Sequence, residues 1–165
     1  MLGRTYDREV CSAARALEVV GERWSLLILR NAAFAGCTRF TDFQQRLGVA
    51  PNILSARLAL FVEEGLMVTV PGDSGHPEYH LTAKGQDLTP AIVALTAWGD
   101  RWAAPDGPPI AYGHTGCDGT VRVQLVCERC HGLVDAAQLT ARPTAAMAAA
   151  RKRRRLPSLP PLPPR

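Results

Sequence analysis

The sequence predicts a mainly α-helical fold with one small β-hairpin (an α+β protein), followed by a separate small unit near the C-terminal end. Apolar residues recur at intervals of three and four through much of the first hundred residues, which is typical of helices that bury one face. Two short apolar segments on either side of a Gly- and Pro-containing cluster interrupt this pattern near residue 74, as the strands of a hairpin would.

Length and composition limit the possible classes of protein. A chain of 165 residues is long enough for one domain with a real core and a small appendage. The hydrophobic content of 47% is ordinary for a globular protein. No apolar run approaches the length of a membrane span, and the first ten residues are polar and charged, unlike a signal peptide. We therefore expect a cytoplasmic protein without a membrane partner.

The net charge of +4 is unevenly distributed along the chain. Residues 1–100 carry nine Lys and Arg against eleven Asp and Glu, whereas residues 101–165 carry ten against four. Any affinity of the first hundred residues for nucleic acid must therefore come from the local placement of Arg and not from bulk charge.

Two helices are expected before residue 36. Residues 11–20 have apolar side chains at helical spacing, and Gly21 ends that helix. Residues 24–35 are apolar on most sides of a helix, a pattern typical of a helix buried in a core or an interface. Gly36 ends the second helix.

Two more helices follow, joined by a short turn. Thr41 is the expected N-cap of the first, and Gly48 turns the chain after it. Pro51 suits the first position of the next helix, which we expect over residues 51–64. The buried stripe of this helix has spacing i, i+4, i+7 and consists of Leu54, Leu58 and Phe61.

The opposite face of the helix over residues 51–64 is small and polar. It presents Asn52, Ser55, Ala56 and Ala59, with Arg57 to one side. Side chains of this kind allow a helix to approach base edges and phosphates closely.

The hairpin is expected from strands at residues 66–70 and 78–82 around a turn at residues 71–77. Thr82 should then cap a helix over residues 83–102. The apolar positions of that helix form a packing seam suited to contact within the chain or between two chains. The seam comprises Leu88, Ile92, Leu95 and Trp98 or Gly99.

Six short motifs occur in a fixed order between residues 19 and 102. They are Gly-Glu-Arg-Trp at 21–24, Arg-Phe at 39–40, Leu-Ser-Ala-Arg-Leu at 54–58, Glu-Glu-Gly-Leu at 63–66, Tyr-His-Leu-Thr at 79–82 and Trp-Gly at 98–99. Each is weak alone, but together they resemble the HxlR-type (MarR-related) family of bacterial transcription regulators. The order of the expected elements is likewise that of a winged helix-turn-helix, whose hairpin is called the wing.

The resemblance implies binding of double-stranded DNA, with residues 51–64 as the recognition helix in the major groove. The side chains that it places near DNA are Arg39, Pro51, Asn52, Ser55, Ala56, Arg57 and, in the wing, His76. The wing departs from the family in one respect, because residues 66–83 contain no Arg or Lys where related proteins often have basic residues.

The resemblance also implies a homodimer formed by the helices at residues 11–20 and 83–102. A dimer would place two recognition helices about one DNA turn apart, roughly 34 Å, and would read an inverted-repeat operator. We expect a repressor whose signal changes the spacing of these helices. The signal could be an oxidant acting on a thiol, a metal ion, or a small molecule held near Trp24 and Trp98.

Residues 1–104 would thus form the DNA-binding and dimerisation domain, and residues 105–111 a linker. Residues 112–140 contain four metal-binding side chains in two pairs, His114 with Cys117 and Cys127 with Cys130. Such a set suits tetrahedral Zn²⁺ and predicts a zinc-ribbon-like unit in which the metal is structural. Alternating Val121, Val123 and Leu125 would form a strand between the pairs, and His131 is a competing ligand.

Other interpretations of the cysteines remain open. Cys127 and Cys130 could be a redox dithiol of an electron carrier or sensor, or their spacing could be incidental. We expect no enzyme, because the sequence has no Gly-rich phosphate loop and no nucleophile–base pair in a motif context. A third alternative is a protein-interaction adaptor that uses the ribbon and the Pro-rich end.

Cys11 occupies the position of a cysteine that senses oxidants or electrophiles in some proteins of the family. A thiol at a helix N-terminus ionises readily and is reactive, although a small side chain at a dimer interface is an equally simple explanation. Cys37, in a loop after Gly36, is expected to be inert. Residues 141–165 include an Ala run, the basic run 151–155 and a Pro-rich end, and we expect them to be disordered.

Overall fold

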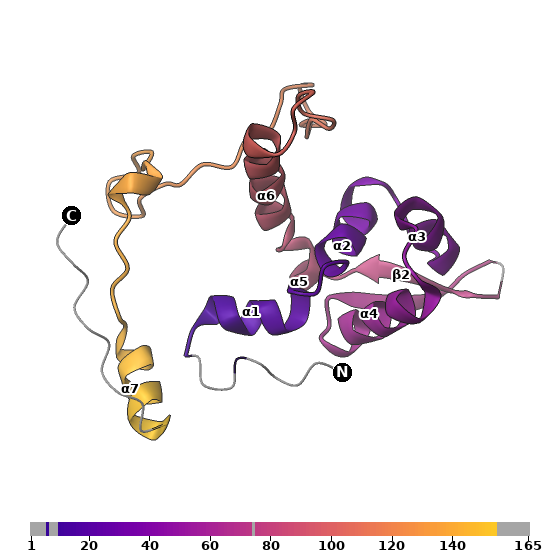
Figure 1. The fold of residues 1–165 in the computed structure, drawn as a ribbon, viewed down its shortest axis with the longest axis horizontal. Helices are drawn as coiled ribbons and strands as arrows, with labels where there is room; N and C mark the ends of the chain where they lie inside the picture. Colours follow the sequence, from indigo (N-terminus) through magenta and orange to yellow (C-terminus); the bar gives the residue numbers. More distant parts are fainter. Residues whose placement is uncertain (1–5, 7–9, 74, 155–165) are drawn as a thin grey trace.

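The computed structural model describes residues 6, 10–73 and 75–154. The described chain is mainly helical with one two-stranded antiparallel sheet, which confirms the predicted fold class (Figure 1). The elements are α1 (Ser12–Val20), α2 (Ser25–Phe34), α3 (Phe40–Leu47), α4 (Pro51–Glu63), β1 (Met67–Pro71), β2 (Pro77–Leu81), α5 (Ala83–Gln86), α6 (Thr89–Trp102), the 3₁₀ helix η1 (Ala136–Gln138) and α7 (Ala145–Arg154).

The core lies where α2, α3, α4 and the first residue of β1 meet. Ile28 and Leu29 of α2 are 0% and 1% exposed, which confirms that this apolar helix is buried. Each neighbouring helix contributes its apolar stripe to the same cluster. The side chains that α3 and α4 bury completely are Phe43, Leu54, Leu58 and Phe61.

The wing is attached to the helical core along one edge. β1 pairs with β2 in antiparallel register from Met67 opposite Leu81 to Pro71 opposite Pro77. The segment before α3 also pairs with β2, since the N–H of Tyr79 donates to the carbonyl of Thr38 at 2.7 Å. The wing is thereby fixed relative to the helix-turn-helix.

The single helix predicted over residues 83–102 is wrong, because the structure divides it into α5 and α6. Pro90 lies in the first turn of α6 and lacks the N–H that a continuous helix would donate to the carbonyl of Gln86. The hydroxyl of Thr89 donates to that carbonyl instead, at 2.7 Å. The predicted cap at Thr82 is confirmed, since its hydroxyl oxygen accepts from the N–H of Gly85.

Gly85 is required for the close contact of α5 with the wing. A Cβ at this position would lie 2.2 Å from the carbonyl oxygen of Leu66, which is far inside van der Waals contact. The same carbonyl accepts the N–H of Thr82 at 3.0 Å. The backbones of α5 and the start of β1 therefore approach more closely than any side chain would allow.

Two further differences concern caps and the C-terminal region. The N-cap of α3 is Arg39 and not the predicted Thr41, and the carboxylate of Asp42 accepts the N–H of Arg39 at 3.1 Å.

Residues 121–125 form no strand, since within the described chain no second strand lies beside them to pair with. They run along α6 instead, with Val121 and Val123 lining a pocket there.

Helix α7 occupies part of the tail that was expected to be disordered. Its Ala-rich sequence has high intrinsic helix propensity, which the basic residues that follow do not oppose. Residues 155–165, including the last Arg of the basic run and the Pro-rich end, lie outside the described residues. None of the helices in the described part of the chain combines the length and apolar character that a membrane span requires.

Candidate nucleic-acid interface

A tight turn sets the angle between α3 and α4. Gly48 ends α3 with φ of 61°, a left-handed conformation that glycine adopts without strain. Val49 in the turn is 2% exposed and anchors it in the core. Pro51 then begins α4 at the first helical turn, where its missing N–H costs nothing.

Helix α4 has a buried face and an open face. Because Leu54 and Leu58 are fully buried, the side chains between them project outward. The open face carries the predicted small and polar residues, all of them exposed, namely Pro51, Asn52, Ser55, Ala56 and Ala59. The structure therefore brings together the α4 residues that the sequence predicts to approach base edges.

Arg57 lies beside this open face and is only partly exposed. Its Nε is buried and has no hydrogen-bond partner within the described chain. A guanidinium N–H without an acceptor is costly, and an incoming phosphate or base acceptor would satisfy it.

Arg39, which the resemblance places near DNA, forms an ion pair within the molecule. Its Nε lies 3.0 Å from Oε1 of Glu78 on β2, and its side chain is 48% exposed. Hydrogen bonding from Arg39 lowers the pKa of the Glu78 carboxyl, while Glu78 raises the pKa of Arg39. Part of the positive charge of Arg39 is thus balanced inside the molecule.

Sequence reasoning missed Arg46, an exposed residue in the last turn of α3. Gln45 beside it is also exposed. Their position in the last turn before Gly48 could have identified them, since the end of α3 lies next to the beginning of α4 in a helix-turn-helix.

His76 lies in the exposed turn between the wing strands, and its carbonyl accepts the N–H of Gly72 at 3.1 Å. His80, on β2, has its Nε2 3.5 Å from a carboxylate oxygen of Glu78. The wing therefore carries His76 at its tip and Glu78 and His80 along one strand.

The thiols outside the C-terminal unit differ sharply in exposure. Cys11 is exposed and directly precedes α1, with no side-chain capping hydrogen bond. Cys37 is 3% exposed, and burial raises the pKa of its thiol. Burial and a raised pKa both keep Cys37 in the unreactive thiol form, as predicted.

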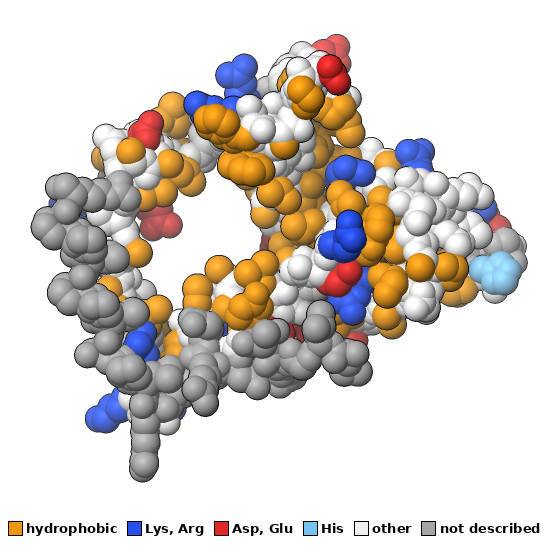
Figure 2. Space-filling model, viewed as in Figure 1, with side chains coloured by type: hydrophobic (Ala, Val, Ile, Leu, Met, Phe, Trp, Pro, Cys, Tyr) orange, Lys and Arg blue, Asp and Glu red, His pale blue; other side chains and the backbone are white. Residues whose placement is uncertain are grey.

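Exposed apolar side chains gather on α1 and α6. Trp98 and Trp102 are 61% and 65% exposed, and Leu95 and Leu17 are also exposed. Figure 2 shows hydrophobic atoms along the edge of an opening that α1, α6 and the C-terminal segments enclose. Large apolar groups of this kind, grouped on two helices, are typical of an interaction surface.

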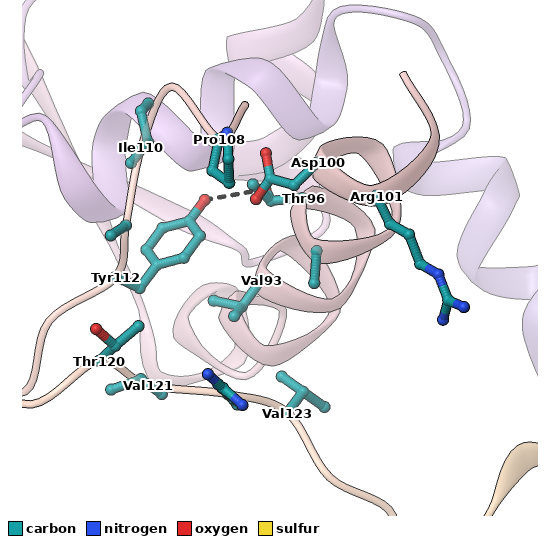
Figure 3. Close-up of a pocket in the computed structure, with 13 residues that line it drawn as sticks. Val93, Thr96, Asp100, Arg101, Pro108, Ile110, Tyr112, Thr120, Val121 and Val123 are labelled. Carbon is teal, nitrogen blue, oxygen red and sulfur yellow. Dashed lines mark hydrogen bonds between the residues drawn. The ribbon is translucent and has the colours of Figure 1, made fainter. Parts of the chain in front are cut away.

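An open pocket of about 520 Å³ lies between α6 and residues 108–123 (Figure 3). The hydroxyl of Tyr112 lies 3.1 Å from that of Thr96, and its ring packs on Phe34 with centroids 4.6 Å apart. Tyr112 thereby attaches the C-terminal segment to α2 and α6. Neither Trp24 nor Trp98, the residues expected to hold a small molecule, lines this pocket.

The four predicted metal ligands are brought together only in pairs. Nδ1 of His114 lies 3.2 Å from Sγ of Cys117. The backbone N–H groups of Cys130 and Arg129 and the thiol of Cys130 donate to Cys127 and lower the pKa of its thiol. Among the described residues no three potential ligands form one metal-binding group.

Comparison with known proteins agrees with the helix-turn-helix arrangement of α3 and α4. A family model described as HxlR-like helix-turn-helix matches residues 19–107. The chain is 44% identical over 135 residues to the uncharacterised HTH-type transcriptional regulator Rv3095 of Mycobacterium tuberculosis, across 80% of this chain and 85% of that protein.

Two solved structures are similar over most of the chain. The crystal structure of PA1607, named as a candidate transcription factor, has a TM-score of 0.74 and 40% identity and covers 84% of this chain and 99% of its own. PA1374 from Pseudomonas aeruginosa, described in the same terms, has a TM-score of 0.60 and 34% identity and covers 87% and 99%. Both similarities extend beyond the segment that the family model covers.

Proposed function

Because this chain belongs to the HxlR-like helix-turn-helix family of transcriptional regulators, we propose that α4 enters the major groove of an inverted-repeat operator and that the protein acts as a dimeric repressor. The observation that carries the proposal is the division of α4 into a fully buried stripe and an open face of small and polar side chains. A helix of this kind can lie deep in the groove, because nothing bulky holds it away.

Three arginines of the helix-turn-helix are the proposed phosphate contacts. Arg46 lies in the last turn of α3, Arg57 lies on α4, and Arg39 precedes α3. They compensate for the acidic balance of the first hundred residues, since affinity for the DNA backbone depends on charges at the contact surface. The wing carries no Lys or Arg and contributes little to this affinity, and His76 at its tip is the wing side chain proposed to lie near DNA.

A second copy of the chain is the proposed occupant of the apolar surface on α1 and α6. Leu95, Trp98 and Trp102 leave large apolar side chains of α6 in water, and Leu17 does so on α1. A two-fold dimer through these helices would hide them and give two α4 helices a fixed separation.

Cys11 is the proposed site of an oxidant signal. It is exposed, and it directly precedes α1, which belongs to the proposed dimer surface. Oxidation there would add bulk at that surface and change the spacing of the two recognition helices. With Cys11→Ser, release of DNA by diamide should be lost, whereas Cys37→Ser should leave it intact; the reverse result would exclude Cys11.

The proposed function is tested by incubating the purified full-length chain with fragments of its own genome and sequencing the retained DNA. The proposal expects recovery of short inverted repeats whose half-sites are about one helical turn, roughly 34 Å, apart. If the retained fragments share no sequence and their retention falls with added salt, the protein binds only the DNA backbone, without sequence specificity. Absence of retention with an intact dimer would favour a protein-interaction adaptor instead.

A further inference from the structure

The C-terminal unit contains a structural repeat with an offset of thirteen residues. In the first copy the N–H of His114 donates to the carbonyl of Gly119 at 2.8 Å, and in the second the N–H of Cys127 donates to that of Gly132 at 3.0 Å. Each copy is closed at its base by an isolated bridge, Gly113 with Thr120 and Val126 with Leu133. We call residues 112–121 and 125–134 the first and second knuckles.

The turn inside each knuckle is the same. The N–H of Asp118 donates to the carbonyl of His114 at 3.0 Å, and the N–H of His131 to that of Cys127 at 2.8 Å. Asp118 and His131 have φ of 54° and 56°, and no other non-glycine residue in the described chain has positive φ. A strained conformation that recurs at both equivalent positions indicates a required turn geometry.

The repeat places the possible metal ligands at matching positions. His114 corresponds to Cys127, and Cys117 to Cys130, so each knuckle offers two donors from the two sides of its turn. Glycine follows in each copy, and a Cβ there would lie 3.3 Å from Sγ of Cys117 or 3.5 Å from Sγ of Cys130. A side chain would therefore be tight beside the sulfur of Cys117 and in ordinary contact beside that of Cys130.

The first pair already has nearly the spacing of two ligands on one ion. Zn–N near 2.0 Å and Zn–S near 2.3 Å at a tetrahedral angle would separate the two donors by roughly 3.6 Å. The observed distance from Nδ1 of His114 to Sγ of Cys117 is 3.2 Å.

The knuckles lie apart, and the extended segment between them makes no strand pairing in the described chain (Figure 1). Apolar side chains at their bases remain exposed, with Val126 55% and Leu133 66% exposed. Each knuckle is too small to bury a core, so nothing but an added constraint would hold the two together.

We propose that the two knuckles of one chain close on a single Zn²⁺, held by His114, Cys117, Cys127 and Cys130. Nine residues separate Cys117 from Cys127, a loop of ordinary length for bringing two turns together. Three soft thiolates and one imidazole favour zinc over hard cations. All four positions are filled by protein, so the metal is structural and its binding is coupled to folding of the unit.

The repeat also excludes the competing histidine. His131 corresponds to Asp118, the residue after the second ligand, and it has the same left-handed backbone. Its role is to make the turn. The chain thus offers two matched variants, His114→Asn at a proposed ligand and His131→Asn at a turn residue. Asparagine tolerates left-handed φ, so His131→Asn should keep the turn.

The test is the zinc content of the full-length chain after gel filtration, measured by inductively coupled plasma mass spectrometry. The wild type and His131→Asn should each carry one zinc ion per chain, and so should Cys11→Ser. His114→Asn and Cys127→Ser should fall to background while their helical circular dichroism persists, because no side chain of the knuckles belongs to the described hydrophobic core of the winged helix-turn-helix. A metal-free wild-type chain that does not take up added Zn²⁺ would overturn the proposal, as would loss of zinc in His131→Asn with retention in His114→Asn.

Mixing distinguishes closure within one chain from closure between two. The variants His114→Asn and Cys127→Ser each keep one intact knuckle, so a site shared by two chains would be rebuilt in their mixture. Closure within a chain predicts that co-refolded mixtures stay at background, and recovery of zinc would contradict it. Because the readout is metal content and not DNA binding, the result is independent of the proposed regulatory function.

Discussion

The guanidinium Nε of Arg39 and the carboxylate Oε1 of Glu78 lie 3.0 Å apart, joining the residue before α3 to a wing strand thirty-nine positions later in the chain. The same two residues form an isolated backbone bridge. The ion pair therefore connects the helix-turn-helix to the wing. It also balances part of the positive charge of Arg39, which weakens the attraction of Arg39 to a DNA phosphate.

The pair predicts a pH dependence of stability on the acid side. Because Arg39 lowers the pKa of Glu78 in the folded protein, the unfolded chain binds a proton at this carboxyl at higher pH than the folded one. The stabilisation is fully present above the ordinary pKa of Glu and is lost as pH falls through the lowered value. Urea unfolding between pH 7 and pH 3 should show a smaller decline for Glu78→Gln than for wild type, whereas the exposed Glu63→Gln should behave as wild type. Equal declines for all three would show that the pair contributes nothing.

Glu78→Gln should also strengthen DNA binding. The change frees the charge of Arg39 and removes a carboxylate near the DNA backbone. One additional phosphate contact would steepen the plot of log affinity against log salt by about 1. Fluorescence anisotropy at several salt concentrations measures this slope, with His80→Gln as a control for the neighbouring partner of Glu78. A weaker affinity with a shallower slope would mean that Glu78 instead holds Arg39 in its binding position.

The buried stripe of α4 should dominate the stability of the helix-turn-helix. Leu58 is 0% exposed, so Leu58→Ala should lower the free energy of unfolding by about 2–5 kcal/mol through lost burial and an unfilled cavity. Val62 on the same helix is 36% exposed, and Val62→Ala should cost about 1 kcal/mol. Chemical denaturation measures both, and equal costs would contradict the assignment of the buried face.

Trp98 should contribute to dimerisation and not to folding of one chain. Since its side chain is 61% exposed, Trp98→Ala should leave the fold of the monomer intact but weaken self-association. Sedimentation equilibrium measures the effect. Val68, an exposed apolar residue of the wing, provides the control, and Val68→Ala should leave the dimer unchanged. If both variants behave like wild type, the apolar surface of α6 has another occupant.

The helix-turn-helix could be predicted from sequence because its signals are local. The apolar spacing of Leu54, Leu58 and Phe61 and the glycine at position 48 each act within one or two turns of chain, and the structure agrees with both. The break between α5 and α6 at Pro90 is also a local signal. The apolar spacing continues on both sides of Pro90, and the sequence therefore predicted one continuous helix.

The rest depended on contacts distant in sequence. Pairing of Arg39 with Glu78 arises only when the wing folds back against the start of α3, so the sequence did not indicate this partner. The alternation at residues 121–125 predicted a strand, yet in the described chain no second strand pairs with it, and residues 121–123 line an open pocket beside α6 instead. The repeat of the two knuckles became visible only through equivalent backbone hydrogen bonds.

The most direct test of α4 as the DNA reader is the affinity of wild type and Asn52→Ala for the recovered operator and for versions with single base-pair changes. If α4 reads the sequence, wild type should lose about 1–3 kcal/mol at each contacted base pair, and Asn52→Ala should no longer discriminate at one symmetric position in each half-site. The exposed Thr69→Ala in the wing should keep the wild-type pattern. If Asn52→Ala, Ser55→Ala and Arg57→Ala all bind and discriminate as wild type does, α4 is not the helix that reads the sequence.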